Sequence, residues 1–328
     1  MKNKKIFIVF TVLLVWAAVP EPNIFAQNYE AKVTYHLVND NGVLLKGFYY
    51  RMTGFYVKFP GAPLTPTNSE GFTDDSGNVT LSLKSALTSI GSGIKWGTPG
   101  YYYSGYSVQL TNSANGKWQP WNPTVKVVVK PILNPIAMYA RDNNMDIPAK
   151  NTPVGFDLIA ADWVVPYGKG TISDFIFTMT EKIPFTKYNQ PYDLTWTLSF
   201  PNKGDGIQSV IGPPLNQGSA LRLPRYAPEA GYESPLVQQL SLNGNKRLNG
   251  ADGEDQNYFF RVRTVLDESG KFKSALYGKI AGPIQYWGNS DVHMMYYLNP
   301  TPNDRNMEFD PKKNLFKNLS DLQQVNAP

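Results

Sequence analysis

Hydrophobic and polar residues alternate with a period of two along much of the chain, which is typical of β-strands that bury one face. The clearest segments are residues 78–84 and 192–200. In the second segment, Tyr, Leu, Trp, Leu and Phe occupy every other position, and Asp, Thr and Ser lie between them. Residues 124–130, 175–180 and 258–266 are further strand candidates. The pattern therefore predicts an all-β protein.

Turn signals separate these segments, and helix signals are few. Gly42, Gly77 and Gly270 each end a short polar run of Asn, Asp, Glu or Ser, as in tight turns that need a positive φ. The chain holds 27 Gly and 26 Pro, which disfavours long helices. Ser234-Pro235 predicts a short helix through Leu240, and Asp310-Pro311 predicts another whose leucines share one face.

The first 26 residues have the pattern of an export signal. Three lysines precede an apolar stretch at residues 6–19, which is shorter than the ~20 residues that a membrane-spanning helix needs. Two prolines follow, and Ala26 offers the small residue that precedes a cleavage site. We predict cleavage after Ala26 and an extracytoplasmic location, which is periplasmic, cell-surface or secreted. The alternative is an uncleaved anchor. No transmembrane span is expected in the mature chain.

Composition excludes several kinds of chemistry. The chain has no Cys, which excludes disulfides, thiolate metal sites and cysteine nucleophiles. It has only 2 His, and the acidic segment 252–257 lacks the spacing of a calcium loop, so no metal and no cofactor is predicted. The net charge is +5, and removal of residues 1–26 leaves +3. A nearly neutral mature chain gives no reason to expect nucleic-acid binding.

A proline-flanked segment predicts the division of the chain into domains. Pro131 and Pro135 follow a predicted strand, and proline suits a linker because it lacks a backbone donor. We predict a signal peptide at 1–26, a β-sandwich domain at 27–133 and a β-rich domain of unassigned family at 134–328.

The first of these domains carries short motifs of a known family. Val38-Asn39-Asp40-Asn41-Gly42 is followed by an apolar stretch, and Thr73-Asp74-Asp75-Ser76-Gly77 precedes the next strand. Together with Gly100-Tyr101, these motifs make residues 31–130 resemble the carboxypeptidase regulatory-like domain, a transthyretin-like sandwich. Leu44 stands where that family usually has Pro. The resemblance implies an accessory or adhesive module without catalytic residues. The expected fold is a transthyretin/immunoglobulin-like sandwich followed by a larger antiparallel β domain.

Seven Trp and Tyr side chains lie between positions 96 and 121. Aromatic rings in a loop bounded by prolines can stack on sugars or anchor a protein partner. The alternative is that the rings fill the core of a small sandwich or the contact between domains. The ligand-binding candidates are Trp96, Tyr102, Trp118 and Trp121. The solvent exposure of Trp118 and Trp121 distinguishes the two interpretations.

No catalytic residues are predicted. The segment Ser290-Asp291-Val292-His293 lacks the geometry of a nucleophilic triad. Arg261 with Arg263, or Arg222 with Arg225, could clamp a carboxylate or phosphate, and the expected alternative is a solvated strand face or ion pairs with Asp and Glu. The function predicted is an exported, non-enzymatic binding or structural protein of the cell envelope or extracellular space. Its expected partner is a polysaccharide or an envelope protein.

The alternative function is an extracytoplasmic glycoside hydrolase-like enzyme. Such an enzyme needs two carboxylates about 5–10 Å apart in a cleft. The residues that could supply them in the second domain are Asp157, Asp162, Asp174, Glu229 and Glu233.

Overall fold

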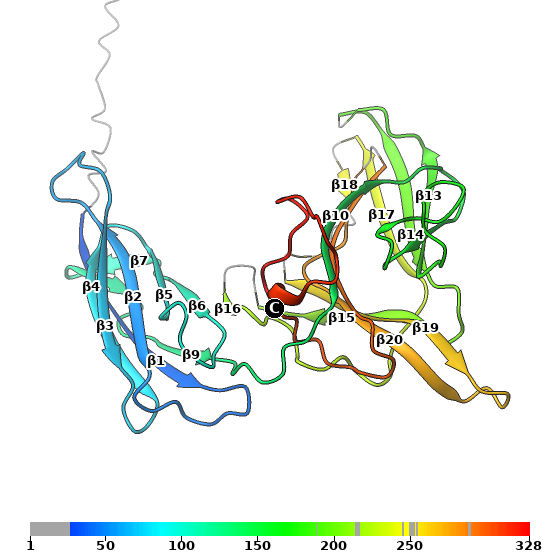
Figure 1. Cartoon of the computed structure of the whole chain (residues 1–328). Helices are drawn as coiled ribbons and strands as arrows, with labels where there is room; N and C mark the ends of the chain where they lie inside the picture. Colours follow the sequence, from blue (N-terminus) through cyan, green and yellow to red (C-terminus); the bar gives the residue numbers. More distant parts are fainter. Residues whose placement is uncertain are drawn as a thin grey trace, which may run out of the picture.

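The computed structural model describes residues 27–187, 189–213, 217–244, 246–248, 253, 255–287 and 290–328. Their regular structure is β-strand, apart from one short 3₁₀ helix, η1 (Pro311–Lys313). The prediction of an all-β fold is therefore confirmed. The strands form an N-terminal part and a C-terminal part, which lie left and right in Figure 1. No helix in the described ranges is long and apolar enough to cross a membrane.

Two sheets make up the N-terminal part. The first sheet contains β1 (Tyr29–Val38), β4 (Asn78–Ser85), β7 (Asn112–Ala114), β8 (Lys117–Gln119) and β9 (Thr124–Val128). The second sheet contains β2 (Tyr49–Tyr56), β3 (Thr65–Phe72), β5 (Ser89–Ile94), β6 (Ser104–Gln109) and β16 (Gly218–Ser219). The order in the second sheet is β16-β6-β5-β2-β3.

The two N-terminal sheets enclose one hydrophobic core. β1 runs antiparallel to β4 and parallel to β8 and β9. Its inward residues Val33, Tyr35 and Leu37 are fully buried, and they share a cluster with Tyr50 and Met52 of β2. The alternating residues of β1 and β4 point out of the sandwich, as the period of two requires.

Two larger antiparallel sheets make up the C-terminal part. One contains β10 (Tyr139–Asp146), β15 (Gly206–Ile211), β19 (Gln256–Leu266), β20 (Phe272–Ile280), β21 (Gln285–Tyr286) and β22 (Asp291–Asn299). The other contains β11 (Val154–Asp157), β12 (Asp162–Trp163), β13 (Phe175–Ile183), β14 (Tyr192–Ser199), β17 (Leu236–Asn243) and β18 (Lys246–Leu248). Trp196 of β14 is fully buried between the sheets, where its ring stacks on Tyr286 at 4.9 Å.

The helix predicted from Ser234-Pro235 through Leu240 is wrong. Residues 236–243 form β17, which pairs with β14 from Leu236 to Leu242. Pairing with a buried central strand satisfies the backbone and overrides the local capping signal. The second predicted helix is limited to η1, which Asp310 caps. Beyond it, the Leu315 N–H donates to the Met138 carbonyl at 2.9 Å, so the chain joins the core instead of continuing as a helix.

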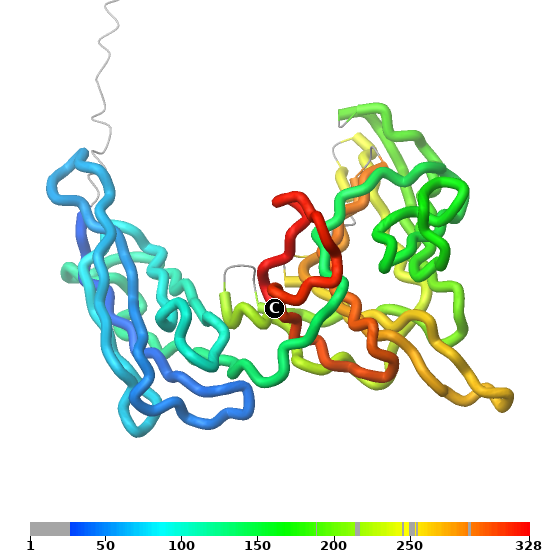
Figure 2. Tube along the Cα trace, in the orientation of Figure 1, coloured from blue at the N-terminus to red at the C-terminus, as the bar shows by residue number. Residues whose placement is uncertain are grey.

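Along the sequence, the connection at residues 131–135 separates the hydrophobic cluster of the N-terminal part from the two clusters of the C-terminal part. One cluster draws on residues 29–129, and the other two draw on residues 136–325. However, β16 comes from late in the chain and pairs with β6 of the N-terminal part. Figure 2 shows this returning segment between the two parts, close to the C-terminus. The domain boundary at 133/134 therefore stays a prediction.

Replacement of Trp118 tests how the N-terminal core is built. The side chain is 8% exposed, its Nε1 donates to the Ser85 carbonyl at 2.9 Å, and its ring meets Tyr29 edge-on. We expect Trp118→Ala to lower the free energy of unfolding by about 3–5 kcal/mol, as for other buried aromatic residues. Urea denaturation measures this loss. Trp96→Ala, at a side chain that is 78% exposed, should change the free energy of unfolding by less than about 1 kcal/mol. Equal losses would contradict the core position of Trp118.

Candidate functional site

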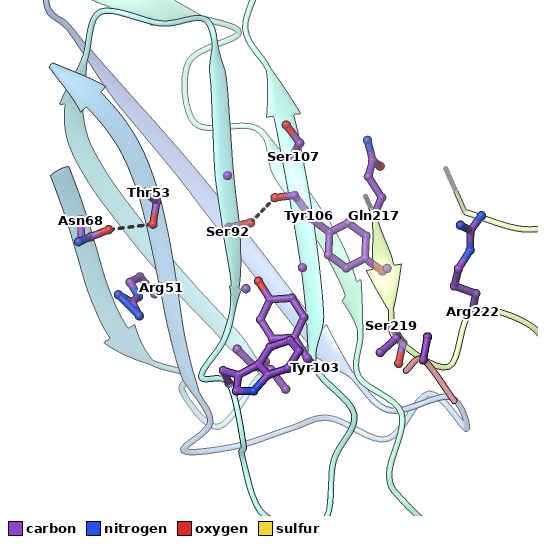
Figure 3. Close-up of a pocket in the computed structure, with 18 of the residues that line it drawn as sticks. Arg51, Thr53, Asn68, Ser92, Tyr103, Tyr106, Ser107, Gln217, Ser219 and Arg222 are labelled. Atoms are coloured by element: carbon purple, nitrogen blue, oxygen red, sulfur yellow. Dashed lines mark hydrogen bonds between the residues drawn. The ribbon is translucent and has the colours of Figure 1, made fainter. Parts of the chain in front are cut away.

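An open groove crosses the outer face of the second N-terminal sheet (Figure 3). Its volume is about 950 Å³, at the upper end of the roughly 300–1,000 Å³ typical of ligand pockets. Strands β2, β3, β5, β6 and β16 all contribute residues to the lining. The groove therefore contains residues from both parts of the chain.

Glycines make the floor of the groove flat. In the sheet register, Arg51 lies opposite Gly93, Gly93 opposite Gly105, and Gly105 opposite Gly218. Three neighbouring strands thus present no side chain along one row. In the adjacent row, a Cβ on Gly91 would have no neighbour nearer than the Thr53 carbonyl at 4.0 Å. The space above Gly91 is open.

Two aromatic rings stand at one end of this floor. The Tyr103 ring lies over the glycine row, where its hydroxyl would be 2.6 Å from a Cβ on Gly93. Trp96 packs against Tyr103 with ring centroids 5.1 Å apart and an interplanar angle of 45°. The Trp96 side chain is 78% exposed, although large apolar residues usually lose most of their surface on folding. The Tyr103 contact holds the indole at the groove while its surface stays in solvent.

The remaining lining combines polar side chains with Pro66, Ile94, Ala220 and Ala327, and its described residues include no Asp or Glu. Thr53 donates to the Asn68 side chain at 2.8 Å, and Arg51 lies 3.7 Å from Glu70 outside the groove. On the opposite wall, Arg222 Nη2 donates to the Pro213 carbonyl at 2.6 Å. Figure 3 shows Gln217 and Arg222 on the β16 side and Thr53 and Asn68 on the β2–β3 side. Hydroxyl and amide groups therefore flank the aromatic end.

Hydrogen bonds between the two parts hold the β16 wall in place. The Ala220 N–H donates to the Tyr103 carbonyl at 2.8 Å, directly after the β16–β6 pairing. Lys130 Nζ donates to the Leu223 carbonyl at 2.8 Å and to the Arg222 carbonyl at 3.3 Å. The wall thus depends on the contact between the parts.

A buried carboxylate lies at the centre of that contact. Glu308 is fully buried, and it accepts hydrogen bonds from the Tyr102 hydroxyl at 2.8 Å and from the N–H groups of Leu133 and Asn134 at 2.9 Å. It also forms an ion pair with Arg225. Arg225 in turn donates to the Pro131 carbonyl at 2.8 Å. The Glu308 side chain therefore joins three segments: the residues just before β6, the proline-flanked connection and the C-terminal part.

The environment of Glu308 favours its charged form. Burial by itself would raise the pKa of this carboxyl group, but hydrogen bonds from Arg225, from the backbone N–H groups and from Tyr102 outweigh burial and lower the pKa. Burial and the adjacent Glu308 carboxylate raise the pKa of the Tyr102 hydroxyl. Tyr102 therefore stays protonated and donates its hydrogen bond to Glu308.

The four predicted ligand-binding residues do not form one site. Trp96 lines the groove, Tyr102 belongs to the contact between the parts, and Trp118 is buried in the N-terminal core. Trp121 lies by the first sheet, and Lys117 Nζ and Lys32 Nζ lie over its ring, 4.4 and 5.9 Å from the ring centroid. Trp118 therefore offers no stacking surface. Tyr103 and the glycines were not singled out from the sequence, because only the strand register brings them together.

The five carboxylates proposed for a hydrolase lie apart from the groove. Asp157 and Asp174 are buried and both bind Arg263, at 3.3 and 2.8 Å. Asp162 accepts from the Lys169 N–H at 3.0 Å. Glu229 pairs with Arg305 at the surface, and Glu233 borders a separate hollow of about 240 Å³ without another carboxylate in its lining.

The other polar motifs have structural partners. His293 bonds Asp142 at 2.6 Å, and the carboxylate raises the pKa of the imidazole. Arg261 Nε donates to the Gly204 carbonyl at 2.7 Å, whereas Arg263 pairs with buried aspartates, so the two arginines do not form a joint clamp. Of the acidic segment 252–257, Asp252 and Glu254 lie outside the described residues.

No family model matches the sequence, and none of the curated proteins matches it either. Among solved structures, a DUF3823 family protein from Parabacteroides merdae is similar at 10% identity, with 82% of this chain and 96% of that chain covered and a TM-score of 0.21. The shaft pilin SpaA from Lactobacillus rhamnosus GG is similar at 14% identity, with 56% and 90% covered and a TM-score of 0.21. Scores this low carry no argument about function.

Removal of the Glu308 charge should loosen the contact between the parts. We expect Glu308→Gln to lower the free energy of unfolding by about 3–5 kcal/mol, because the buried Arg225 would lose its nearer carboxylate and keep only the longer pair with Asp40 at 3.4 Å. The pKa of Glu308 is lowered in the folded state, so its contribution is present at neutral pH and is lost as the pH falls below the ordinary carboxyl range. Urea denaturation at pH 7 and pH 3 measures both effects.

Glu229→Gln is the matched control. Glu229 also pairs with an arginine, but its side chain is 81% exposed, and exposed pairs contribute only about 0–1 kcal/mol. If the two variants lost the same stability at pH 7, Glu308 would not be the central contact.

Proposed function

We propose that the protein is an exported, non-enzymatic binding protein of the cell envelope or extracellular space, and that the groove binds a carbohydrate chain. The observation that carries this proposal is the exposed Trp96 ring, held by Tyr103 at the end of a floor made of glycines. A flat ring beside an open floor suits the flat face of a sugar. Export is supported by the basic and apolar pattern of residues 1–26.

The polar groups of the groove fit sugar hydroxyls. Thr53, Asn68, Ser107 and Gln217 offer both donors and acceptors along the walls. The glycine row crosses three strands, the Tyr103 ring covers it at Gly93 and Gly105, and the space above Gly91 is open. A groove of this form suits several consecutive units of a polymer. It holds no carboxylate pair for glycosidic cleavage, so binding without reaction is the activity that we infer.

Binding to immobilised glycans tests the proposal. Residues 27–328 are incubated with insoluble polysaccharides, peptidoglycan and isolated cell envelope, and the retained fraction is measured. We expect retention on at least one glycan and a loss of affinity of about 30-fold in Trp96→Ala, as for an aromatic side chain that dominates an interface. Trp287→Ala is the control, because Trp287 is also exposed and does not line the groove.

A second variant blocks the groove without removing a contact. Gly91→Val places a side chain in open space on a strand, where β-branched residues are favoured, so the fold should be kept while the floor is filled. Gln239→Val, at an exposed position of β17 and outside the lining, is its control. Retention that neither Trp96→Ala nor Gly91→Val reduces would refute the groove as the binding site. No retention on any glycan would refute carbohydrate binding for the polymers tested.

A further inference from the structure

The outer face of the first N-terminal sheet carries a second polar surface, which we call the lysine face. It is built from four rows that cross β4, β1 and the neighbouring strands β8 and β9. In the register, Glu30 lies between Lys84 and Lys117, Thr34 lies between Thr80 and Thr124, and His36 lies between Asn78 and Lys126. Lys32 lies opposite Ser82 in the remaining row. These residues alternate with the buried residues of the sandwich core, so they all point outward.

Positive charge on the lysine face is not balanced. Lys32, Lys84, Lys117 and Lys126 form no ion pair with any described residue, and Glu30 is the single acidic residue in the four rows. The mature chain has a net charge of only +3, so the lysine face holds a large share of the excess positive charge of the chain. Like charges placed close together on a sheet cost stability, which an anionic partner would offset.

The lysines surround groups that hydrogen-bond without charge. Thr34 donates to the Asn122 side-chain oxygen at 3.0 Å, and its hydroxyl meets the Thr80 hydroxyl at 2.8 Å. Beside this row, the ammonium groups of Lys117 and Lys32 lie over the Trp121 ring. From the Glu30 row to the His36 row the face runs six residues along β1, about 20 Å at the usual rise per residue.

We propose that the lysine face binds an acidic polysaccharide, laid along the strands. Charge complementarity identifies the partner as a polyanion, and the threonine and asparagine groups between the lysines match sugar hydroxyls. Nucleic acid is a poorer fit, because two lysine ammonium groups already lie over the Trp121 ring, the large aromatic side chain beside the face on which a base would stack. A lipid surface is a poorer fit, because no aliphatic side chain projects from the four rows. This surface is separate from the groove, which lies on the other sheet.

Oligogalacturonate of fixed length is the probe, with dextran of equal length as its neutral counterpart. Binding of residues 27–328 is measured by isothermal titration calorimetry at 50 and 300 mM salt. We expect binding of oligogalacturonate only, weakened at the higher salt because screening acts on exposed charges. Lys32→Gln/Lys117→Gln should weaken it roughly tenfold or more, since each cation near an anionic surface contributes on the order of a few-fold to tenfold.

Lys271→Gln/Lys273→Gln is the matched control, because it removes two exposed lysines from the C-terminal part. It should leave the affinity within about twofold. Gly91→Val should also keep it, which distinguishes this proposal from the groove. Equal weakening by the two lysine pairs, equal binding of dextran, or tighter binding of single-stranded DNA or of vesicles containing anionic lipid would each overturn the assignment. Unchanged thermal unfolding of the variants confirms that they are folded.

Discussion

The contact between the two parts depends on one buried carboxylate. Glu308 accepts hydrogen bonds from Tyr102 and from two N–H groups of the proline-flanked connection, and it neutralises Arg225. A buried charge is tolerated only when it is paired and fully hydrogen-bonded, so these partners must stay in place together. Because the β16 wall is attached at the same contact, the geometry of the groove follows from that requirement.

The N-terminal sandwich uses its two outer faces in different ways. On the second sheet, missing side chains at Gly91, Gly93 and Gly105 create a floor beside Trp96. On the first sheet, long cationic side chains cover the rows around Thr34. A sheet with one face in the core leaves the other face free for recognition, and the choice of side chains at alternate positions decides its chemistry.

Local pattern was sufficient for many strands and insufficient where distant pairing competes with it. Segments 78–84 and 192–200 form β4 and β14 with the expected faces buried, because alternation itself specifies which side enters the core. Residues 236–243 carry a helix-start signal, yet they pair with β14. Leu315 likewise bonds Met138 from far away in the chain. Capping signals contribute about 1 kcal/mol, which a full ladder of strand pairs outweighs.

The sequence by itself determined that the chain is all-β, which faces of its main strands are buried, and which chemistries the absence of cysteine excludes. Tertiary structure alone decided the fate of the aromatic cluster. Trp96 and Trp118 lie in the same aromatic-rich segment, but one is exposed at the groove and the other fills the core. The reason is that strand register is a property of pairs of strands. β16 pairs with β6 from a distant place in the sequence, beside the contact in which Tyr102 donates to the buried Glu308 carboxylate.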